Sequence, residues 1–235
     1  MTVVGLLHPG EMGAAVGAEI DARVIWASEG RSEATRARAA AFPDAGSIEA
    51  LVDEADIILS ICPPHAALDV ARQCAGFTGI YVDANAISPQ RAQEIASLQP
   101  RFVDGGIVGS PPPAEGTTLY LSGADAQTVA MLFVGSALRP RVVANASAVK
   151  MAYAAWSKGT TAMLLAIREV ARANGIEDEW RLAAPELAEK LPRADAAKAK
   201  KGWRWIGEME EIADTFAAAG QPDGFHRAAA EVYRA

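Results

Sequence analysis

The sequence predicts an α/β fold, with a doubly wound, mostly parallel sheet over residues 1–145 followed by an all-helical domain over residues 146–235. Short aliphatic runs alternate with alanine-rich helical stretches in the first part, which is typical of βαβ units on a parallel sheet. Right-handed crossovers between such units produce a doubly wound arrangement. From residue 146 onward helical spacing continues without a convincing strand, so we expect helices alone in the second part.

The aliphatic runs are the predicted strands, and the stretches between them are the predicted helices. Strands are expected at Val3–Leu7, Arg23–Ala27, Asp56–Ile61, Ile80–Ala84, Phe102–Val108 and Thr118–Ser122. Helices are expected near residues 11–20, 31–41, 47–54, 64–75, 88–97 and 125–137.

The second part begins with one unbroken helical pattern over residues 146–174, which ends at Asn174 and Gly175, a typical helix stop. Helical stretches follow near 178–190, 195–219 and 222–234, punctuated by Pro185, Pro192 and residues 220–222. The helix over residues 146–174 would be on the order of 40 Å long, too long for one small domain to cover. We therefore expect a homodimer built through residues 146–235.

Composition excludes several classes of protein. Of the 235 residues 51% are hydrophobic, which is too many for a disordered chain. The net charge of −7 disfavours nucleic acid and anionic membranes as partners, although a local basic pocket for a small anionic substrate remains compatible with it. The two cysteines form no disulfide framework, and the N-terminal sequence lacks the features of a secretory signal. We expect a cytoplasmic protein without a metal site, because the three histidines lie far apart.

The turn after the first predicted strand has the character of a dinucleotide-binding, Rossmann-type turn. Gly10 and Gly13 take the second and third positions of G-x-G-x-x-G, which admit the pyrophosphate and let helix and strand pack closely. His8 stands where the first glycine is expected. A tight connection without a ligand would explain the same residues. The predicted cofactor contacts here are His8, Pro9, Gly10, Glu11, Met12 and Gly13.

The end of the second predicted strand favours NADP, with NAD possible. The place of the acidic residue that grips the ribose of NAD falls on Ala27, which leaves room for a 2′-phosphate. Ser28, Arg31 and Ser32 offer hydrogen-bond donors and a positive charge. Two alternatives stay open: Arg31 and Ser32 simply begin a solvated helix, or Glu29 is the missing acid, displaced along the chain.

The end of the third predicted strand adds two candidate cofactor contacts. Cys62 and Pro63 end the third strand at the edge where doubly wound sheets bind ligands, although residues that simply end a strand and begin a helix would look the same.

Along the long helix, Lys150, Tyr153 and Lys158 recur at helical spacing on an otherwise apolar surface. This polar face lies either in solvent or in a ligand cleft. In a cleft, Lys150 would serve as the acid–base group in the oxidation of an alcohol.

The order of these motifs resembles the β-hydroxyacid dehydrogenase and 6-phosphogluconate dehydrogenase superfamily. Residues 5–13 (GLLHPGEMG) resemble its G-x-I-G-x-G-x-M-G opening, and residues 82–89 (VDANAISP) its D-x-S-T-I-S-P loop. Residues 102–110 (FVDGGIVGS) resemble F-x-D-A-P-V-S-G-G, and Lys150 falls at the position of the catalytic lysine. The resemblance implies a hydride transfer between nicotinamide and a small hydroxy or oxo acid. It also implies that Asn85, Gly109 and Ser110 hold the substrate or the nicotinamide amide.

Departures from the family pattern make 6-phosphogluconate itself a doubtful substrate. The serine of V-S-G-G falls on Val108, and the asparagine that follows the family's lysine falls on Tyr153 or Ala154. Residues 202–211 (GWRWIGEMEE) replace the family's later Lys-Asp motif, as in a bacterial subgroup of phosphogluconate dehydrogenase-like proteins with its own C-terminal domain. Tyr153 by this match, and Lys158 by its helical spacing from Lys150, are further candidate substrate contacts. Lys158 either favours the neutral amine of Lys150 as a neighbouring cation or pairs with a carboxylate. The alternatives are an imine reductase, which typically lacks the lysine, or a non-catalytic dinucleotide-binding protein.

Overall fold

The computed structural model describes residues 1–235 and divides them into two units, Met1–Lys150 and Met151–Ala235. We expected the boundary between residues 145 and 146. The observed division falls inside helix α7 (Ala146–Ala154), whose first turns belong to the sheet unit. The reason is local: hydrogen bonds from the start of α7 reach Asp104 and Ser122 of the sheet.

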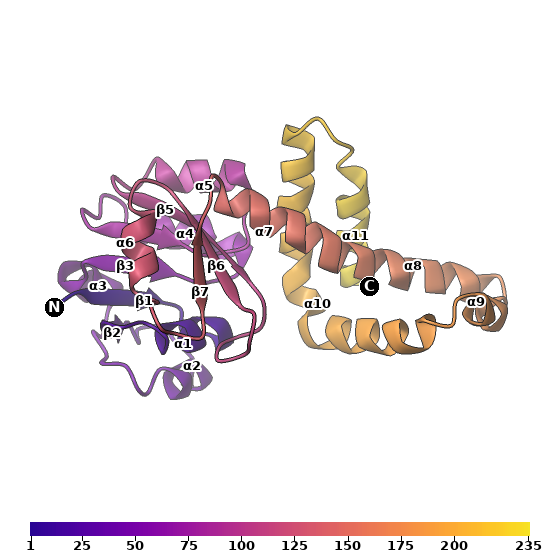
Figure 1. Ribbon diagram of the computed structural model, residues 1–235, viewed down its shortest axis with the longest axis horizontal. Helices are drawn as coiled ribbons and strands as arrows, with labels where there is room; N and C mark the ends of the chain where they lie inside the picture. The colour runs from indigo at the N-terminus through magenta and orange to yellow at the C-terminus, as the bar shows by residue number, and fades with distance from the viewer. The chain divides into compact units, whose positions relative to one another are not determined.

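A seven-stranded, mostly parallel sheet forms the first unit and confirms the predicted fold class (Figure 1). The strands stand in the order β2-β1-β3-β4-β5-β6-β7. Their bounds are β1 Val3–Leu7, β2 Arg23–Trp26, β3 Ile57–Ser60, β4 Ile80–Asp83, β5 Phe102–Val108, β6 Thr118–Ser122 and β7 Arg139–Val142. All the strands predicted from the sequence are present.

Strands β1 to β5 are parallel, and their order reverses between β1 and β3. Such a reversal opens a crevice at the carboxyl ends of the strands, where doubly wound sheets bind their ligands. An isolated parallel bridge between Trp26 and Asp44 extends the sheet beyond β2. The sheet thus places the ends of β1, β2 and β3 next to one another.

Strand β7 was not predicted. Its sequence, Arg-Pro-Arg-Val, lacks the aliphatic pattern of a strand, and most of it is exposed. It pairs in parallel with β6, which itself runs antiparallel to β5. As an edge strand it tolerates charge and proline, which discourage pairing with other chains. The helix expected over 125–137 is correspondingly shorter, α6 Ala126–Met131.

Two apolar cores cover the two faces of the sheet. Leu6 and Leu59 face one core with α1 (Glu11–Gly17) and α6, whereas their neighbours Leu7 and Ile58 face the other. This alternation is the pleat of the strands, which sends successive side chains to opposite faces. The second core is covered by α3 (Ile48–Glu54), α4 (Ala67–Gln73) and α5 (Pro89–Ala96). The remaining short elements are α2 (Glu33–Arg38) and a 3₁₀ turn, η1 (Pro64–Ala66).

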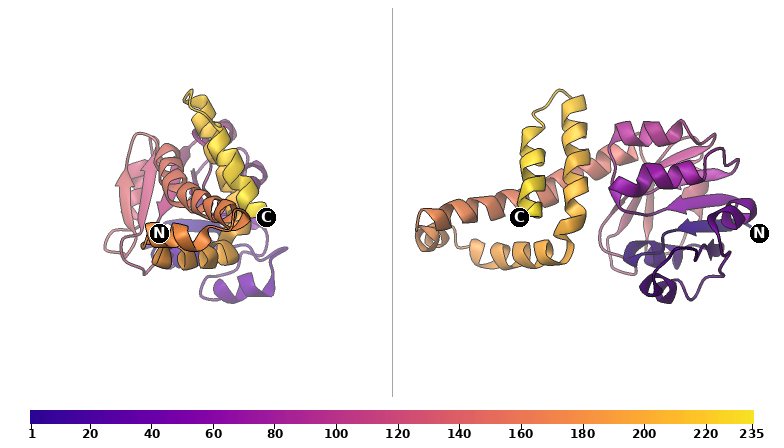
Figure 2. Two further views of the ribbon diagram at one scale, coloured as in Figure 1. Left: turned by 90° about the vertical axis from the view of Figure 1, so that its right-hand side faces the viewer. Right: turned by 180° about the vertical axis from the view of Figure 1, so that it is seen from behind.

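Helices alone make up the second unit, as expected. The end of α7 continues through a π-helical turn, η2 (Ala155–Gly159), into α8 (Thr160–Ala173). Then come α9 (Glu177–Ala183), α10 (Leu187–Ala218) and α11 (Gly224–Arg234), and the last two run side by side (Figures 1 and 2). No helix in the chain is long and apolar enough to cross a membrane.

Helix α10 continues through Pro192, where we expected a break. Proline removes one helical hydrogen bond and crowds the preceding turn. Leu187, Leu191 and Ala194 are buried on either side of it, so that packing on both flanks holds the helix together. Figure 1 shows that α10 instead bends sharply along its length.

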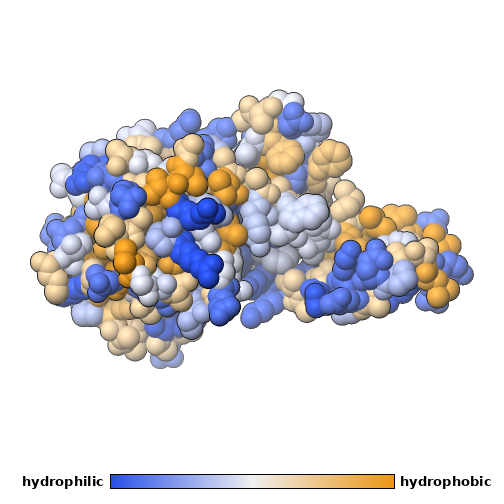
Figure 3. Space-filling model, viewed as in Figure 1, coloured by the Kyte–Doolittle hydropathy of each residue, from blue (hydrophilic) through white to orange (hydrophobic).

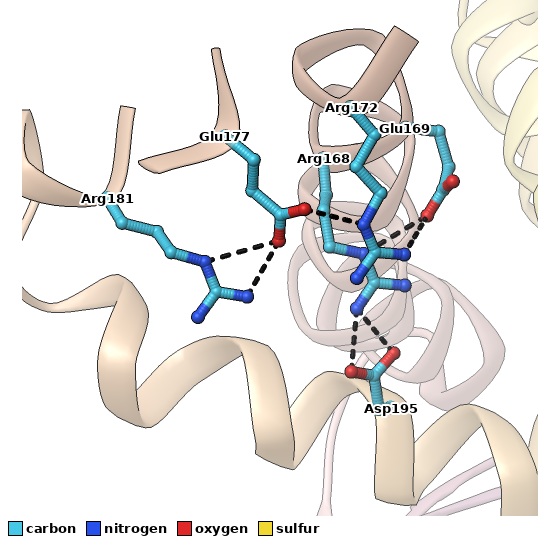
Figure 4. Close-up of polar contacts among 6 residues, drawn as sticks. All are labelled: Arg168, Glu169, Arg172, Glu177, Arg181 and Asp195. Carbon is cyan, nitrogen blue, oxygen red and sulfur yellow. Dashed lines mark hydrogen bonds and ion pairs between the residues drawn. The ribbon is translucent and has the colours of Figure 1, made fainter. Parts of the chain in front are cut away.

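Ion pairs join α8, α9 and α10 at one end of the helical unit (Figure 4). Arg168 of α8 makes a two-pronged contact with Asp195 of α10, at 2.7 and 2.6 Å. Glu177 of α9 accepts hydrogen bonds from Arg172 and Arg181. Since the Arg168 side chain is only 11% exposed, its pair is shielded from solvent more than an ordinary surface pair.

Candidate functional site

The parallel strands β1 to β5 bring most of the predicted site residues to one edge of the sheet. Their carboxyl ends share this edge because the strands run in one direction. The residues that follow these ends are His8, Pro9 and Gly10 after β1, Ser28, Arg31 and Ser32 after β2, Cys62 and Pro63 after β3, Asn85 after β4, and Gly109 and Ser110 after β5.

The first turn has the backbone of a dinucleotide turn although His8 replaces its first glycine. His8 has a φ of 61°, in the left-handed region that glycine favours. Its carbonyl accepts a hydrogen bond from Gly10 N at 2.7 Å. A Cβ on Gly13 would lie 2.8 Å from that same carbonyl oxygen, so only glycine fits there.

Gly10 differs from Gly13 because nothing in the protein crowds it. A Cβ on Gly10 would meet its nearest heavy atom, the His8 carbonyl oxygen, only at 4.0 Å. Its φ of −70° is also open to any residue. Neither packing nor backbone conformation requires a glycine here, although glycine suits the N-cap position that it holds before α1. The need to leave space for a ligand, as for the pyrophosphate of a dinucleotide, does explain it.

Two polar atoms next to this turn are buried without hydrogen-bond partners: Nδ1 of His8 and Nε of Arg31. Burial, together with the nearby positive charge of Arg31, lowers the pKa of His8 to about 4. Burial also lowers the pKa of Arg31. Because buried polar groups in native proteins are normally satisfied, this pair indicates a place for an anion.

The two serines predicted to bind a 2′-phosphate already have partners in the protein. Ser32 caps α2, accepting a hydrogen bond from Thr35 N at 3.3 Å. The buried Ser28 hydroxyl donates to Asp44, and this bond lowers the pKa of the Asp44 carboxyl. Of the three predicted residues, Arg31 alone therefore offers an unmatched buried donor.

Asn85 links the ends of β3 and β4 from within the protein. Its side-chain nitrogen donates to Asp83 at 2.8 Å and to Ser60 at 3.2 Å, and its oxygen accepts from the Cys62 backbone. Since both of its N–H groups are in use, direct donation to a ligand would require one of these bonds to break. Burial, with Asp83 nearby, raises the pKa of the Cys62 thiol to about 12, so that this cysteine stays protonated.

Lys150, the predicted acid–base residue, is held against the end of β5. Its Nζ donates to the Ile107 carbonyl oxygen at 2.8 Å. A Cβ on Gly106 would lie 2.8 Å from the Cβ of Lys150, so that glycine is what lets α7 approach the strand. After β5, Gly109 has a φ of 127° and Ser110 is exposed, and the Ser110 carbonyl accepts from Thr117 at 2.5 Å.

Asp104 of β5 is a site residue that the sequence analysis did not single out. Its carboxylate accepts hydrogen bonds from the Ser147 backbone and hydroxyl and from Ser122, and so anchors the first turn of α7. Burial raises its pKa in spite of these bonds. A charged residue inside an apolar strand was the available signal. Asp104 positions the helix from which Lys150 projects.

Tyr153 and Lys158 belong to the second unit, so a role for them beside Lys150 stays a prediction. Tyr153 is 45% exposed. Lys158 lies in the π-helical turn η2 and forms a buried ion pair with Glu208 of α10. Trp205 packs over the same ammonium, and Tyr233 donates to the Lys158 carbonyl at 2.6 Å. In this structure Lys158 therefore serves to join η2 to α10 and α11.

The residues present fit a dinucleotide, and none of the acidic, histidine or cysteine side chains gather into a metal site. Gly10 leaves room for a pyrophosphate, and Arg31 with His8 provides unmatched polar atoms beside it. No group of three or more His, Cys, Asp or Glu side chains is arranged to hold a metal ion.

Comparison with solved structures identifies the superfamily of this fold. The conserved protein MTH1747, of unknown function and described as structurally similar to 3-hydroxyacid dehydrogenases, matches with a TM-score of 0.71 and 26% identity. That match covers 99% of this chain and 97% of the other. By its fold, the chain belongs to the β-hydroxyacid dehydrogenase-like superfamily. The resemblance seen in the sequence motifs is thereby confirmed.

Other proteins of this fold are similar over all of this chain and most of their own length, at lower identity. The 3-hydroxyisobutyrate dehydrogenase of Mycobacterium tuberculosis has a TM-score of 0.67 and 18% identity, covering 100% of this chain and 93% of the other. A reductive aminase from Aspergillus terreus, in complex with NADPH and ethyl levulinate, has a TM-score of 0.59 and 14% identity, with the same coverage. Both similarities show the shared fold.

Matches found from the sequence alone cover a smaller part of this chain. A family model described as a domain of unknown function (DUF1932) matches residues 171–235. An uncharacterised 28.5 kDa protein of Methanothermus fervidus is 32% identical over 140 residues, 55% of this chain. That match spans about half of the relative's length, 53%.

Proposed function

We propose that the protein is an NAD(P)-dependent oxidoreductase that transfers a hydride between nicotinamide and a small hydroxy or oxo acid. The observation that supports a dinucleotide best is Gly10, a glycine that neither packing nor backbone conformation requires. The fold of the superfamily supports the same reaction class.

The finer proposal for the cofactor is NADP(H). Ala27 is buried at the end of β2, where an NAD-binding enzyme carries an acidic residue. Arg31 follows with a buried, unmatched nitrogen, suited to an extra phosphate. Glu29, the other candidate for the missing acid, is exposed, and its backbone N–H donates to Gly46.

Lys150 is the proposed acid–base group. When bound, the nicotinamide supplies or accepts the hydride. Lys150 would donate a proton to the substrate oxygen during reduction and accept it during oxidation. The contact with the Ile107 carbonyl and the close approach at Gly106 support this role, since they hold the ammonium at the carboxyl edge of the sheet.

The test is turnover of NADPH and NADP with a panel of small oxo and hydroxy acids. We expect activity in the unmodified protein, and Lys150→Ala should lower kcat by roughly 100- to 10,000-fold with little change in cofactor affinity. Lys150→Arg should be almost as inactive, because an arginine keeps the charge but does not release a proton near neutral pH.

Three other outcomes would overturn parts of the proposal. Reduction of imines in place of oxo acids would assign the chain to imine reduction. Tight cofactor binding without turnover on any substrate would make it a dinucleotide-binding protein. Normal turnover of Lys150→Ala would move the acid–base role to another group, with Tyr153 the next candidate.

A further inference from the structure

His8 combines an unusual backbone with an unusual side chain. A left-handed conformation is uncommon for residues other than glycine, and such residues concentrate at functional sites. The dinucleotide turn needs this conformation at its first position, which glycine would adopt without cost. His8 therefore brings something to the turn that glycine lacks, namely an imidazole.

The imidazole lies beside the residue already proposed to select the cofactor. Arg31 is near enough for its charge to disfavour the protonated form of His8. Arg31 also interacts electrostatically with Cys62, which follows β3, so it lies near the ends of both β1 and β3, where the strand order reverses. Each of the two side chains keeps a buried nitrogen without a partner.

Arg31 and the imidazole of His8 each keep a buried nitrogen unmatched, which is unfavourable in a protein without a ligand. A phosphate between them would satisfy both nitrogens and reverse the sign of the local field. Arg31 is the charged group that faces His8, and Cys62 stays a neutral thiol. With an anion bound, the charge that now opposes protonation of His8 would be offset.

We propose that His8, together with Arg31, contacts a phosphate of the bound dinucleotide and takes up a proton from solvent when that phosphate binds. This rests on the proposed function. The free imidazole carries one N–H, and the incoming proton occupies its second nitrogen, giving an imidazolium paired with the phosphate. Cofactor affinity then rises as the pH falls toward 6, and His8 makes the cofactor site sensitive to pH.

The experiment is calorimetric titration of the full chain with NADPH and with NADH. Each titration is run at about pH 8 and about pH 6, in two phosphate-free buffers of different ionisation enthalpy, so that proton uptake is measured directly. The variants are His8→Gly, which suits the left-handed backbone, and His8→Asn, which tolerates that backbone and keeps a polar side chain that does not titrate.

We expect wild-type protein to take up more protons on binding NADPH near pH 6 than either variant. Its affinity advantage over His8→Asn should be about tenfold greater near pH 6 than near pH 8, as for a hydrogen bond that gains a charge. Uptake with NADPH alone would assign the contact to the 2′-phosphate. Uptake with NADH as well would assign it to the pyrophosphate. Both results support this inference, but the second would contradict the selection of NADP(H) by Arg31.

Equal proton uptake and equal pH dependence in wild type and both variants would overturn this inference and leave the proposed function standing. A wild-type protein that binds neither dinucleotide would overturn both. The cofactor's own phosphate also takes up protons, but it does so with the variants as well as with wild type. The difference between wild type and variants therefore reports proton uptake by His8.

Discussion

At the scale of single residues, two glycines of one turn have different causes. Gly13 is required by the fold, because a side chain would press on the His8 carbonyl. Gly10 has space around it and an ordinary backbone conformation. A sequence motif treats the two alike, whereas their surroundings separate a glycine that the fold requires from one that we propose leaves space for a ligand.

Alanine substitution should separate the two roles. Gly10→Ala should change the free energy of unfolding by less than about 1 kcal/mol while weakening NADPH binding. Gly13→Ala should cost about 1–3 kcal/mol of stability, because the added methyl meets backbone. Urea unfolding and a fluorescence titration with NADPH measure both effects. A Gly10→Ala protein with unchanged cofactor affinity would remove the main support for a dinucleotide at this turn.

Arg31 should decide the choice of cofactor. Arg31→Ala should weaken NADP(H) binding by at least about tenfold and leave NAD(H) nearly unchanged, since only NADP(H) carries the extra phosphate. Ser32→Ala is the matched control, because its hydroxyl caps α2 and its loss should act on stability more than on cofactor preference. Equal affinities of the unmodified protein for both cofactors would refute the assignment.

At the scale of elements, the π-helical turn η2 is fixed by contacts from two other helices. Glu208 of α10 forms an ion pair with Lys158 of this turn. From α11, Tyr233 donates a hydrogen bond to the backbone carbonyl of Lys158, and His226 lies against Gly159. Burial lowers the pKa of His226, whose ring packs on that of Phe216. The irregular turn therefore depends on tertiary contacts.

Lys158 and Glu208 form a buried ion pair, so removing one of the two charges should destabilise the protein more than removing both. Lys158→Met should cost on the order of 3 kcal/mol, because it removes a positive charge next to a buried carboxylate. Combining it with Glu208→Leu should restore most of the loss. Urea unfolding of the single and double variants measures the coupling. Simple addition of the two single effects would show that the pair does not act as a unit.

At the scale of the whole molecule, the second unit exposes an apolar stripe. Met163, Ile167 and Val170 follow one face of α8 and are 48%, 43% and 63% exposed, with Trp156 of η2 at 73%. Figure 3 shows hydrophobic residues over α8 and α9. Contiguous apolar surface of this kind marks interaction sites in folded proteins. We propose that a second copy of the chain covers it.

The dimer should form mainly through residues 146–235, and Ile167→Glu should weaken it. Light scattering at micromolar concentration should give twice the 24.6 kDa of one chain. Ile167→Glu should raise the dissociation constant by about 30-fold or more, about 2 kcal/mol. Gln221→Glu adds the same charge at an exposed turn and should leave the mass unchanged. A wild-type protein that stays monomeric would contradict the proposal.

Local patterns in the sequence predicted six of the seven strands, the helical second part and the superfamily. Leu6 and Leu7 alternate between two cores, and Ile57–Ser60 is a strand because its own residues are mostly aliphatic and β-branched. These features depend on near neighbours in the chain, so periodicity detects them. The order of motifs from Gly5 to Lys150 was likewise visible without a structure.

Which side chains already have hydrogen-bond or ion-pair partners becomes visible only in the folded protein. Asn85 has its amide hydrogens bound to Ser60 and Asp83, and Lys158 is paired with Glu208, fifty positions further along the chain. Strand β7 exists because β6 offers it an edge, and α10 passes Pro192 because both flanks are buried. Apart from Asp83, the partners named here lie far from these residues in the sequence. The composition of a segment therefore does not reveal which distant residues it will contact.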